Sequence, residues 1–347
     1  MFIYGKITFL NKNKKNVRII KINSTKVQDY FSRKYFISII KNGRIYTDNV
    51  SNVAIIDKNN LINIGSYQQI NGKLENIKFN ICKKIGTPRI KKKFTGQIFS
   101  FAQGASGHNN YSHWLLDILP KINIYNQKFD ISKVDYFYLN KLNKFQKESL
   151  KLLKLKHIKI IDSNIYRHIE ANKIISTSHP WYKKGYILKE QKYIPKWIVF
   201  WLRKNLLINI KKKNSVDKIF IDRSDSNSNH CQLINNSEVK KFFLNRGFKI
   251  VKLAKFSFKE QIKLFYNSKI IVGPHGAGLT NLVFCRKNSK VIEIRPKNHP
   301  NDVYKRICSI NKLKYKLFKT PTNVKTANGD IYVDLEKLKQ LKKFLNF

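Results

Sequence analysis

The sequence predicts an α/β protein with a doubly wound C-terminal domain and a β-rich N-terminal segment. In the second half, short segments rich in Val and Ile alternate with amphipathic segments of helical period, in the order β-α-β-α-β-α-β. This order is typical of a parallel sheet covered by helices. Near the N-terminus, short alternating segments are broken by Asn, Gly and Lys, as in strands joined by hairpins.

Three parts are expected along the chain. They are a β-rich N-terminal segment at 1–90, an α/β domain with an interdomain helix at 91–213, and a Rossmann-like domain at 214–347. A chain of 347 residues, of which 42% are hydrophobic, is long enough to bury more than one core.

The middle of the chain opens with a loop rich in Gly, Ser and Asn at 103–112, which leads into an expected helix at 113–127. Expected strands at 134–140 and 157–162 enclose an expected helix at 144–154. The alternation favours a parallel sheet in this part as well.

The segment 190–213 combines aromatic, aliphatic and basic residues, as does a helix that lies on an anionic membrane. Its apolar residues 197–202 surround the expected helix instead of forming one stripe. That distribution favours a buried core or interdomain helix over a membrane helix.

The C-terminal domain has the clearest boundaries. Ser257 and Glu260 have the spacing of a capping box, and Gly247 follows the end of the preceding helix. The expected strands are 217–222, 248–253, 269–273 and 290–294, and the expected helices are 235–247, 257–268 and one that begins shortly after residue 273.

The net charge is strongly positive, with 69 Lys and Arg against 21 Asp and Glu, or +48. Such a charge suits an anionic partner, which includes nucleic acid, the inner face of a membrane and phosphorylated substrates. The even spread of Lys along the chain is equally consistent with a compositional bias. We expect no nucleic-acid partner, because the chain has no RNP-like strand, zinc spacing or basic amphipathic arm.

The four cysteines, at 82, 231, 285 and 308, have neither metal-ligand spacing nor a paired pattern. They are expected to be free thiols in a reducing compartment. No signal peptide is visible and no apolar run approaches the roughly 20 residues of a membrane-spanning helix. We expect a cytoplasmic protein, with peripheral contact at the inner membrane face.

The stretch IIVGPHGAGLTNLVF at 270–284 is a strand, a tight turn and a helix start, with His275, Gly276, Ala277 and Gly278 in the turn. Free N–H groups at a helix start bind phosphate, and glycines let an oxyanion approach the backbone. The histidine can donate a further hydrogen bond. Taken alone, the glycines are explained equally well by close packing of the helix on the strand.

Two other strand ends favour the phosphate interpretation. Arg223 and Ser224 follow the strand at 217–222, and Glu293 lies in the strand at 290–294. An arginine offers a planar pair of donors to a diphosphate, and a carboxylate accepts hydrogen bonds from ribose hydroxyls. We therefore expect a nucleotide-diphosphate site that has neither the G-x-G-x-x-G fingerprint nor a P-loop.

His113 and Asp117 are four residues apart, so they share one face of the expected helix. The spacing suits a carboxylate general base with a neighbouring histidine that orients it or binds substrate. A buried pair that only anchors the helix is the simpler alternative. The chain has no Asp-x-Asp arrangement for a metal–diphosphate, so no metal site is expected.

Three segments resemble glycosyltransferase family 61, the former DUF563 group: SHWLLDILPKI at 112–122, FIDRSD at 220–225, and the stretch at 257–294. The family includes bacterial capsular polysaccharide transferases, plant xylosyl- and arabinosyltransferases, and animal O-GlcNAc transferases. The resemblance is specific across 217–295 and absent before residue 90.

The resemblance implies a GT-B-like architecture, with two Rossmann-like domains that face a cleft. It also implies inverting, metal-independent transfer from a nucleotide sugar, with UDP as the expected nucleotide, to a glycan or lipid-linked glycan acceptor in surface polysaccharide biosynthesis. No cofactor other than the donor is implied. A non-catalytic nucleotide-sugar binder remains the alternative from the same fold, and a basic nucleic-acid-binding protein is a more distant one.

The resemblance assigns roles to the residues singled out above. Arg223, Ser224 and the turn at 275–278 hold the donor diphosphate, and Glu293 lies by the nucleoside. His113 and Asp117 face the acceptor. Asp117 is the favoured base, and an exchange of roles within the pair stays open.

Overall fold

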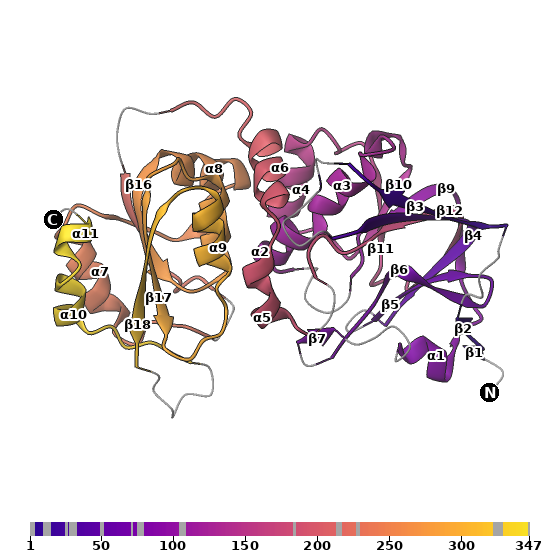
Figure 1. Cartoon of the computed structure of the whole chain (residues 1–347), viewed down its shortest axis with the longest axis horizontal. Coiled ribbons are helices and arrows are strands. Elements are labelled where there is room, and N and C mark those ends of the chain that lie inside the picture. Colours follow the sequence, from indigo (N-terminus) through magenta and orange to yellow (C-terminus); the bar gives the residue numbers. More distant parts are fainter. Residues whose placement is uncertain are drawn as a thin grey trace. The chain divides into compact units, whose positions relative to one another are not determined.

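The computed structural model divides the chain into two compact units, Met1–Trp201 (unit 1) and Leu202–Phe347 (unit 2) (Figure 1). The residues described are 4–9, 15–24, 27, 33–48, 52–70, 72–74, 80–103, 109–182, 185–212, 217–226, 230–321 and 329–345. The glycines of the predicted loop, Gly104 and Gly107, lie outside these residues.

Unit 1 is built on one large mixed sheet. Over the described residues it has eleven strands, with the path β11-β10-β9-β12-β4-β5-β6-β7-β13, and β2 and β3 pair with β6 and β4. The strands of unit 1 are β1 Tyr4–Gly5, β2 Thr8–Phe9, β3 Val17–Ile22, β4 Tyr35–Thr47, β5 Asn52–Asp57, β6 Asn60–Ile70, β7 Lys73–Leu74, β8 Thr87–Pro88, β9 Lys92–Ser100, β10 Tyr136–Leu139, β11 Lys159–Asp162, β12 His168–Thr177 and β13 Gly185–Tyr186.

The predicted N-terminal segment and the predicted middle domain share this sheet. Strand β4 pairs antiparallel with β12, from His168 opposite Tyr46 to Thr177 opposite Ile37. On the other side of β12, strands β9, β10 and β11 run parallel to one another. The chain therefore divides after Trp201, whereas the sequence suggested boundaries at 90 and 213. Alternation shows that residues near the N-terminus form strands, but not which distant strand each one joins.

Short helices connect and cover this sheet. The predicted helix at 113–127 is split into α2, a π-helical turn η3 and α3. The Leu119 N–H donates to the Trp114 carbonyl, five residues earlier, at 3.0 Å, which is the hydrogen bond of a π-helical turn. The next residue, Pro120, has no N–H and cannot donate within the helix. The helices of this unit are α1 Ile81–Ile85, α2 Tyr111–His113, η3 Trp114–Ile118, α3 Pro120–Tyr125, η4 Ile131–Lys133, α4 Lys144–Leu152, α5 Ile187–Glu190, η5 Gln191–Tyr193 and α6 Lys196–Leu206, which continues into unit 2.

Unit 2 confirms the predicted doubly wound domain. Over its described residues the sheet has five strands, which are parallel and have the order β15-β14-β16-β17-β18. The strands are β14 Asp217–Ile221, β15 Lys249–Val251, β16 Ser268–Pro274, β17 Lys290–Pro296 and β18 Lys314–Thr320. The helices are α7 Asn236–Leu244, η6 Leu253–Lys255, α8 Phe258–Asn267, η7 Ala277–Phe284, α9 Val303–Ile310, α10 Leu335–Lys339 and α11 Lys342–Leu345.

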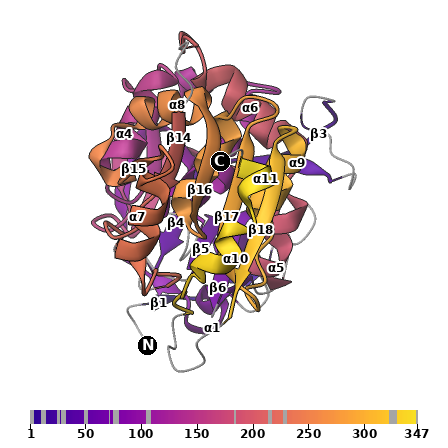
Figure 2. The ribbon, with the colours of Figure 1, turned by 90° about the vertical axis from the view of Figure 1, so that its left-hand side faces the viewer.

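Helices cover both faces of the unit 2 sheet. Helices α7, α10 and α11 lie on the face nearer the viewer in Figure 2, and α8 and α9 lie on the other face. Phe243 of α7 and Leu338 of α10 pack with Phe220, Val272 and Ile292 of the strands in one buried core. Burial of these apolar side chains is the main force that holds the layers together.

Local signals in the sequence also appear in the structure. The capping box predicted at Ser257 and Glu260 is formed at the start of α8. All four cysteines are buried and free. Over the described residues, every helix is too short or too polar to span a bilayer.

Candidate functional site

The order of strands in unit 2 fixes where a ligand would bind. In chain order the sheet reads 2-1-3-4-5, so the direction of winding reverses between the neighbouring strands β14 and β16. Ligands of open α/β sheets bind beyond the carboxyl ends of the strands at this reversal. Arg223 follows β14 and His275 follows β16. The structure therefore brings two of the predicted residues to the switch point itself.

Arg223 lies against the turn that follows β16. Its Nη1 donates a hydrogen bond to the His275 carbonyl. A Cβ atom at Gly276 would stand 2.5 Å from the guanidinium carbon, so this contact requires glycine. Gly278 is restricted in a different way, because a Cβ there would stand 2.5 Å from Cδ1 of Leu253. One glycine thus admits the arginine, and the other permits close packing.

The His275 ring is fixed by a buried carboxylate. Its Nδ1 lies 2.6 Å from Oε1 of Glu293, and the Tyr315 hydroxyl donates to Oε2 of the same carboxylate at 2.5 Å. Glu293 is fully buried and His275 is 4% exposed. Because Nδ1 faces a carboxylate it carries the proton, and Nε2 is the ring nitrogen left for a ligand.

A tyrosine of α9 contacts the backbone that follows His275. The Tyr304 hydroxyl donates to the Gly276 carbonyl at 2.6 Å. The backbone then enters η7, whose first N–H groups, those of Ala277 and Gly278, have no carbonyl within the helix to bond. These two residues keep partial solvent exposure. The turn therefore presents backbone donors beside the arginine and the histidine.

The surroundings of this turn are electropositive. Burial, followed by the charges of His275 and Arg295, lowers the pKa of His299 to about 3. Burial and the charge of Arg223 also lower the pKa of His230. Burial is the larger cause of both shifts, and the neighbouring positive charges add to it.

Ser224 lies at the edge of the group. Its side chain is exposed, and its backbone N–H donates to Oδ1 of Asp222 at 2.9 Å. The turn formed in this way carries the chain away from β14 directly after Arg223. Ser224 follows Arg223 in the chain, and its hydrogen bond to Asp222 stabilises the turn that follows β14.

The second predicted pair, in unit 1, is also formed. His113 Nδ1 lies 2.6 Å from Oδ2 of Asp117, on the consecutive turns α2 and η3. Asn110 positions this segment, since its side chain accepts hydrogen bonds from the backbone N–H groups of Ser112 and His113. The side chain of Asp117 is 3% exposed and that of His113 is 12% exposed. Over the described residues, His113 Nε2 forms no hydrogen bond.

Both oxygens of Asp117 are occupied by donors. Trp181 Nε1 donates to Oδ1 at 2.7 Å, and Gln103 Nε2 donates to Oδ2 at 3.2 Å. Burial alone would raise the pKa of the Asp117 carboxyl. The charge and hydrogen bond of His113, with the hydrogen bond of Trp181, outweigh burial and lower that pKa. Asp117 is thus a buried carboxylate that stays ionised.

Four residues that sequence reasoning missed complete this cluster: Gln103, Lys121, His179 and Trp181. His179 Nδ1 accepts from the N–H groups of Trp181 and Tyr182, so its proton is on Nε2, 3.8 Å from Asp117 Oδ2. Burial lowers the pKa of His179 to about 3 and that of Lys121 to about 7, although the charge of Asp117 opposes both shifts.

These residues meet because two parallel strands are neighbours. Gln103 follows β9, and His179 and Trp181 follow β12, which pairs with β9 in parallel. Their loops therefore emerge at the same sheet edge. The signal in the sequence is the cluster HPWY at 179–182 directly after a strand, but it becomes informative only when the strand pairing is known.

A comparison with known protein families identifies the family of the chain. The profile of the family Glycosyltransferase 61 matches residues 111–292, which is more than half of the chain. The α/β fold is consistent with this match. The chain belongs to glycosyltransferase family 61, as the sequence predicted.

The matched region contains the His113–Asp117 pair, Arg223 and the His275 turn, and it ends one residue before Glu293. A search of curated proteins found no match to the chain. Within the parts of the chain that the structure describes, no group of three or more His, Cys, Asp or Glu side chains could hold a metal ion.

Proposed function

We propose that this chain is an inverting, metal-independent glycosyltransferase that acts in surface polysaccharide biosynthesis. It moves a sugar from a nucleotide sugar, with UDP as the expected nucleotide, to a glycan or lipid-linked glycan. The observation that carries the proposal is the contact between Arg223 and the His275 turn at the switch point of unit 2. A guanidinium and the N–H groups of a helix start converge there, and each is a donor to a diphosphate. Nε2 of His275 faces the same position and donates as well when the ring is an imidazolium, which the Glu293 carboxylate stabilises.

The proposal includes a GT-B architecture, in which unit 2 supplies the donor side and unit 1 the acceptor side. The parallel, doubly wound sheet of unit 2 supports it. In unit 1, the parallel strands β9, β10 and β11 are connected by α2, η3 and α3 and then by α4, which is the βαβ connection of a Rossmann-like half.

In the proposed reaction, an acceptor hydroxyl oxygen attacks the anomeric carbon while the bond from that carbon to the phosphate oxygen breaks. The nucleoside diphosphate leaves with the electron pair of that bond, and the anomeric configuration inverts. Arg223, His275 and the start of η7 stabilise the charge that develops on the diphosphate. Because these donors neutralise the leaving group, the proposal needs no metal ion.

The hydroxyl proton moves to Nε2 of His113 in this proposal. Sequence reasoning favoured Asp117 as the base, and the geometry favours the exchange that it left open. Asp117 is the more buried partner, both of its oxygens accept hydrogen bonds, and its pKa is lowered, all of which make it a weak base. It is well suited to hold Nδ1–H of His113 and to stabilise the imidazolium.

Glu293 also receives a role different from the one its sequence position suggested. A fully buried carboxylate whose two oxygens accept from His275 and Tyr315 is poorly placed to bind a ribose. We assign it to positioning the His275 ring. We further propose a cytoplasmic location with peripheral contact at the inner membrane face, which the charge of +48 supports.

A panel of nucleotide sugars tests the proposal. Thermal-shift measurements on the full chain should identify a donor, and release of free nucleotide should then depend on an added acceptor. Stabilisation by a nucleotide sugar without any turnover, over a broad acceptor panel, would support the non-catalytic binder instead. If no nucleotide or nucleotide sugar stabilises the chain, the proposal is wrong.

A further inference from the structure

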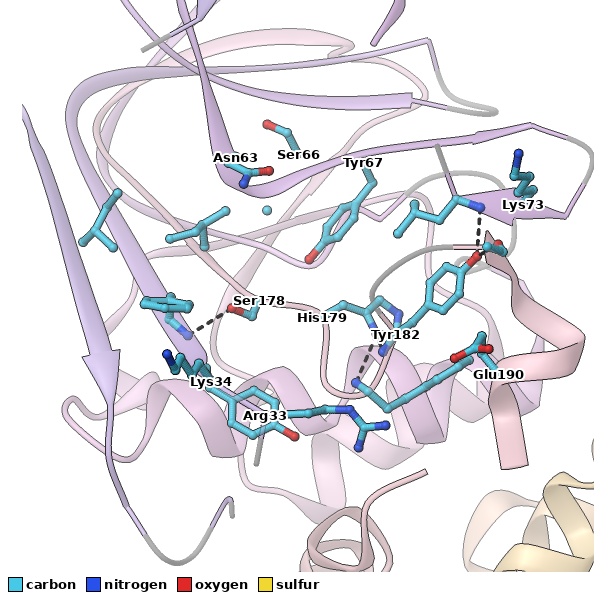
Figure 3. Close-up of a pocket in the computed structure, with 18 residues that line it drawn as sticks. Arg33, Lys34, Asn63, Ser66, Tyr67, Lys73, Ser178, His179, Tyr182 and Glu190 are labelled. Carbon is cyan, nitrogen blue, oxygen red and sulfur yellow. Dashed lines mark hydrogen bonds between the residues drawn. The ribbon is translucent and has the colours of Figure 1, made fainter. Parts of the chain in front are cut away.

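Unit 1 contains a large cavity beside the Asp117 cluster, with a volume of about 1070 Å³ (Figure 3). This volume is at the upper end for small-molecule sites and is ample for more than one sugar ring. Side chains from β4, β6 and β7 and from the loop after β12 form its wall. The lining residues used below are Arg33, Lys34, Tyr67, Lys73, His179, Trp181, Tyr182 and Glu190.

Two residues of the cavity wall also belong to the Asp117 cluster. His179 and Trp181 line the cavity, and both contact the carboxylate of Asp117. Tyr67, another wall residue, packs edge-on against His179 with ring centroids 6.1 Å apart. A molecule in this cavity therefore contacts residues that position the Asp117 carboxylate. Asp117 in turn positions His113.

The wall combines aromatic rings with positive charge. Tyr67, Trp181 and Tyr182 contribute aromatic side chains to the wall, and each of them is 3–7% exposed. Arg33, Lys34 and Lys73 carry three positive charges against the single negative charge of Glu190, among the lining residues described (Figure 3).

Arg33 and Lys34 are suited to hold an anion. Arg33 donates one hydrogen bond from Nη2 to the Tyr193 carbonyl at 3.0 Å, which anchors the side chain. The positive charge of Arg33 also acts on the buried His179, because it contributes to the lowered pKa of that residue. Lys34 is exposed, so its ammonium is free to turn to a ligand at low cost.

We propose that this cavity binds an anionic saccharide, and that Arg33 and Lys34 hold its negative group. This inference rests on the proposed function and names the class of its acceptor: a sugar that carries a carboxylate or a phosphate. A uronic acid within a glycan and a sugar phosphate attached to a lipid carrier share this chemistry. In either case the sugar lies against the part of the wall that carries His179 and Trp181, the residues that contact Asp117.

Titration calorimetry of the full chain with small probes tests the inference. The probes are methyl β-glucuronide, glucose 1-phosphate and the neutral methyl β-glucoside. UDP is present in excess so that anionic probes do not occupy the donor site. We expect at least one anionic probe to bind about tenfold more tightly than the glucoside, as for one charged hydrogen bond. The anionic probe that binds more tightly shows whether the negative group of the acceptor is a carboxylate or a phosphate.

Two variants locate the binding. Lys34→Glu reverses an exposed charge at the cavity and should weaken the anionic probe about tenfold or more, while binding of the glucoside is unchanged. Lys141→Glu reverses an exposed charge outside the lining residues and should have no effect. Arg33→Ala, at a half-buried arginine, should weaken binding of the anionic probe as well, and Arg89→Ala, at an exposed arginine of unit 1 outside the lining residues, is its control.

Equal affinity for the neutral and anionic probes overturns the inference, and so does wild-type affinity of Lys34→Glu. The two proposals fail separately. If UDP binds and the anionic probes show no preference, only the cavity assignment is wrong. If the probes bind as expected and UDP does not bind at all, the donor site and the proposed function are wrong.

Discussion

His113 and Asp117 form a hydrogen bond of 2.6 Å between Nδ1 and Oδ2, and His275 and Glu293 repeat that length between Nδ1 and Oε1. In each pair the carboxylate is the more deeply buried partner. The geometry fixes the same tautomer in both rings and leaves Nε2 as the functional atom. In our account the Nε2 of His113 accepts a proton from the acceptor, and the Nε2 of His275 donates to the leaving diphosphate when the ring is an imidazolium.

The first prediction concerns the base. His113→Gln should lower kcat by about 10²- to 10⁴-fold, because the variant keeps a polar side chain but loses the proton acceptor. Affinity for the donor should change little. The measurement is the initial rate against donor and acceptor, with circular dichroism to confirm folding. His157→Gln, at an exposed histidine of unit 1, is the matched control. A folded His113→Gln enzyme with nearly normal kcat would return the role of base to Asp117.

The second prediction concerns Glu293. Glu293→Gln keeps the volume but removes the charge that faces Nδ1 of His275 and accepts from Tyr315. We expect UDP to bind about threefold to tenfold more weakly, since the ring loses its fixed orientation. Glu336→Gln, at an exposed glutamate of α10, should bind UDP normally. If Glu293→Gln is folded and binds UDP as tightly as the wild type, the carboxylate has no positioning role.

The third prediction concerns metal ions. Arg223, His275 and the start of η7 neutralise the diphosphate in our account, so EDTA should leave the transfer rate nearly unchanged. The assay compares rates before and after chelation and after addition of Mg²⁺ or Mn²⁺. A rate that collapses with EDTA and returns with either metal would contradict the metal-independent mechanism.

The fourth prediction concerns stability and pH. Burial lowers the pKa of His179 to about 3, whereas an unfolded histidine has a pKa near 6.5. Between these values the unfolded chain binds a proton that the folded chain does not, so the free energy of unfolding falls as the pH falls from about 6.5. His179 alone contributes up to roughly 1.4 kcal/mol per pH unit over this window.

Urea unfolding of the wild type and of His179→Gln at several pH values from 5 to 7.5 measures this contribution. The variant should lose less stability per pH unit than the wild type does, because glutamine does not titrate. The same slope in both proteins would mean that His179 is not held neutral by the fold.

The sequence predicted unit 2 well because its signals are local. The alternation of strands and helices fixes a parallel sheet, and short right-handed connections leave few possible orders of strands. The capping box at Ser257 and Glu260 depends on four adjacent residues. Arg223 and His275 followed from the same rule, since both lie at carboxyl ends of strands in that sheet.

The sequence predicted unit 1 less well because its arrangement depends on distant pairings. The contact of His179 and Trp181 with Asp117 requires β12 to lie beside β9. The predicted N-terminal segment and middle domain share one sheet because β4 pairs with β12, which lies more than 100 residues later in the chain. The burial of Glu293 was also missed, because the hydrogen bond that occupies its second oxygen comes from Tyr315 on β18, a strand that the pattern did not identify.

Calorimetric titration of UDP into the full chain and its Arg223→Ala variant tests the central claim most directly, namely that a nucleoside diphosphate binds at the switch point of unit 2. Arg286→Ala is the control, because Arg286 is a half-buried arginine of the same unit that donates to the Tyr266 carbonyl, ahead of the amino end of β17. We expect Arg223→Ala to weaken binding by roughly 10- to 100-fold, as for the loss of a charged hydrogen bond of about 1.5–3 kcal/mol, and Arg286→Ala to bind normally. An unchanged Kd for UDP in folded Arg223→Ala would contradict the account.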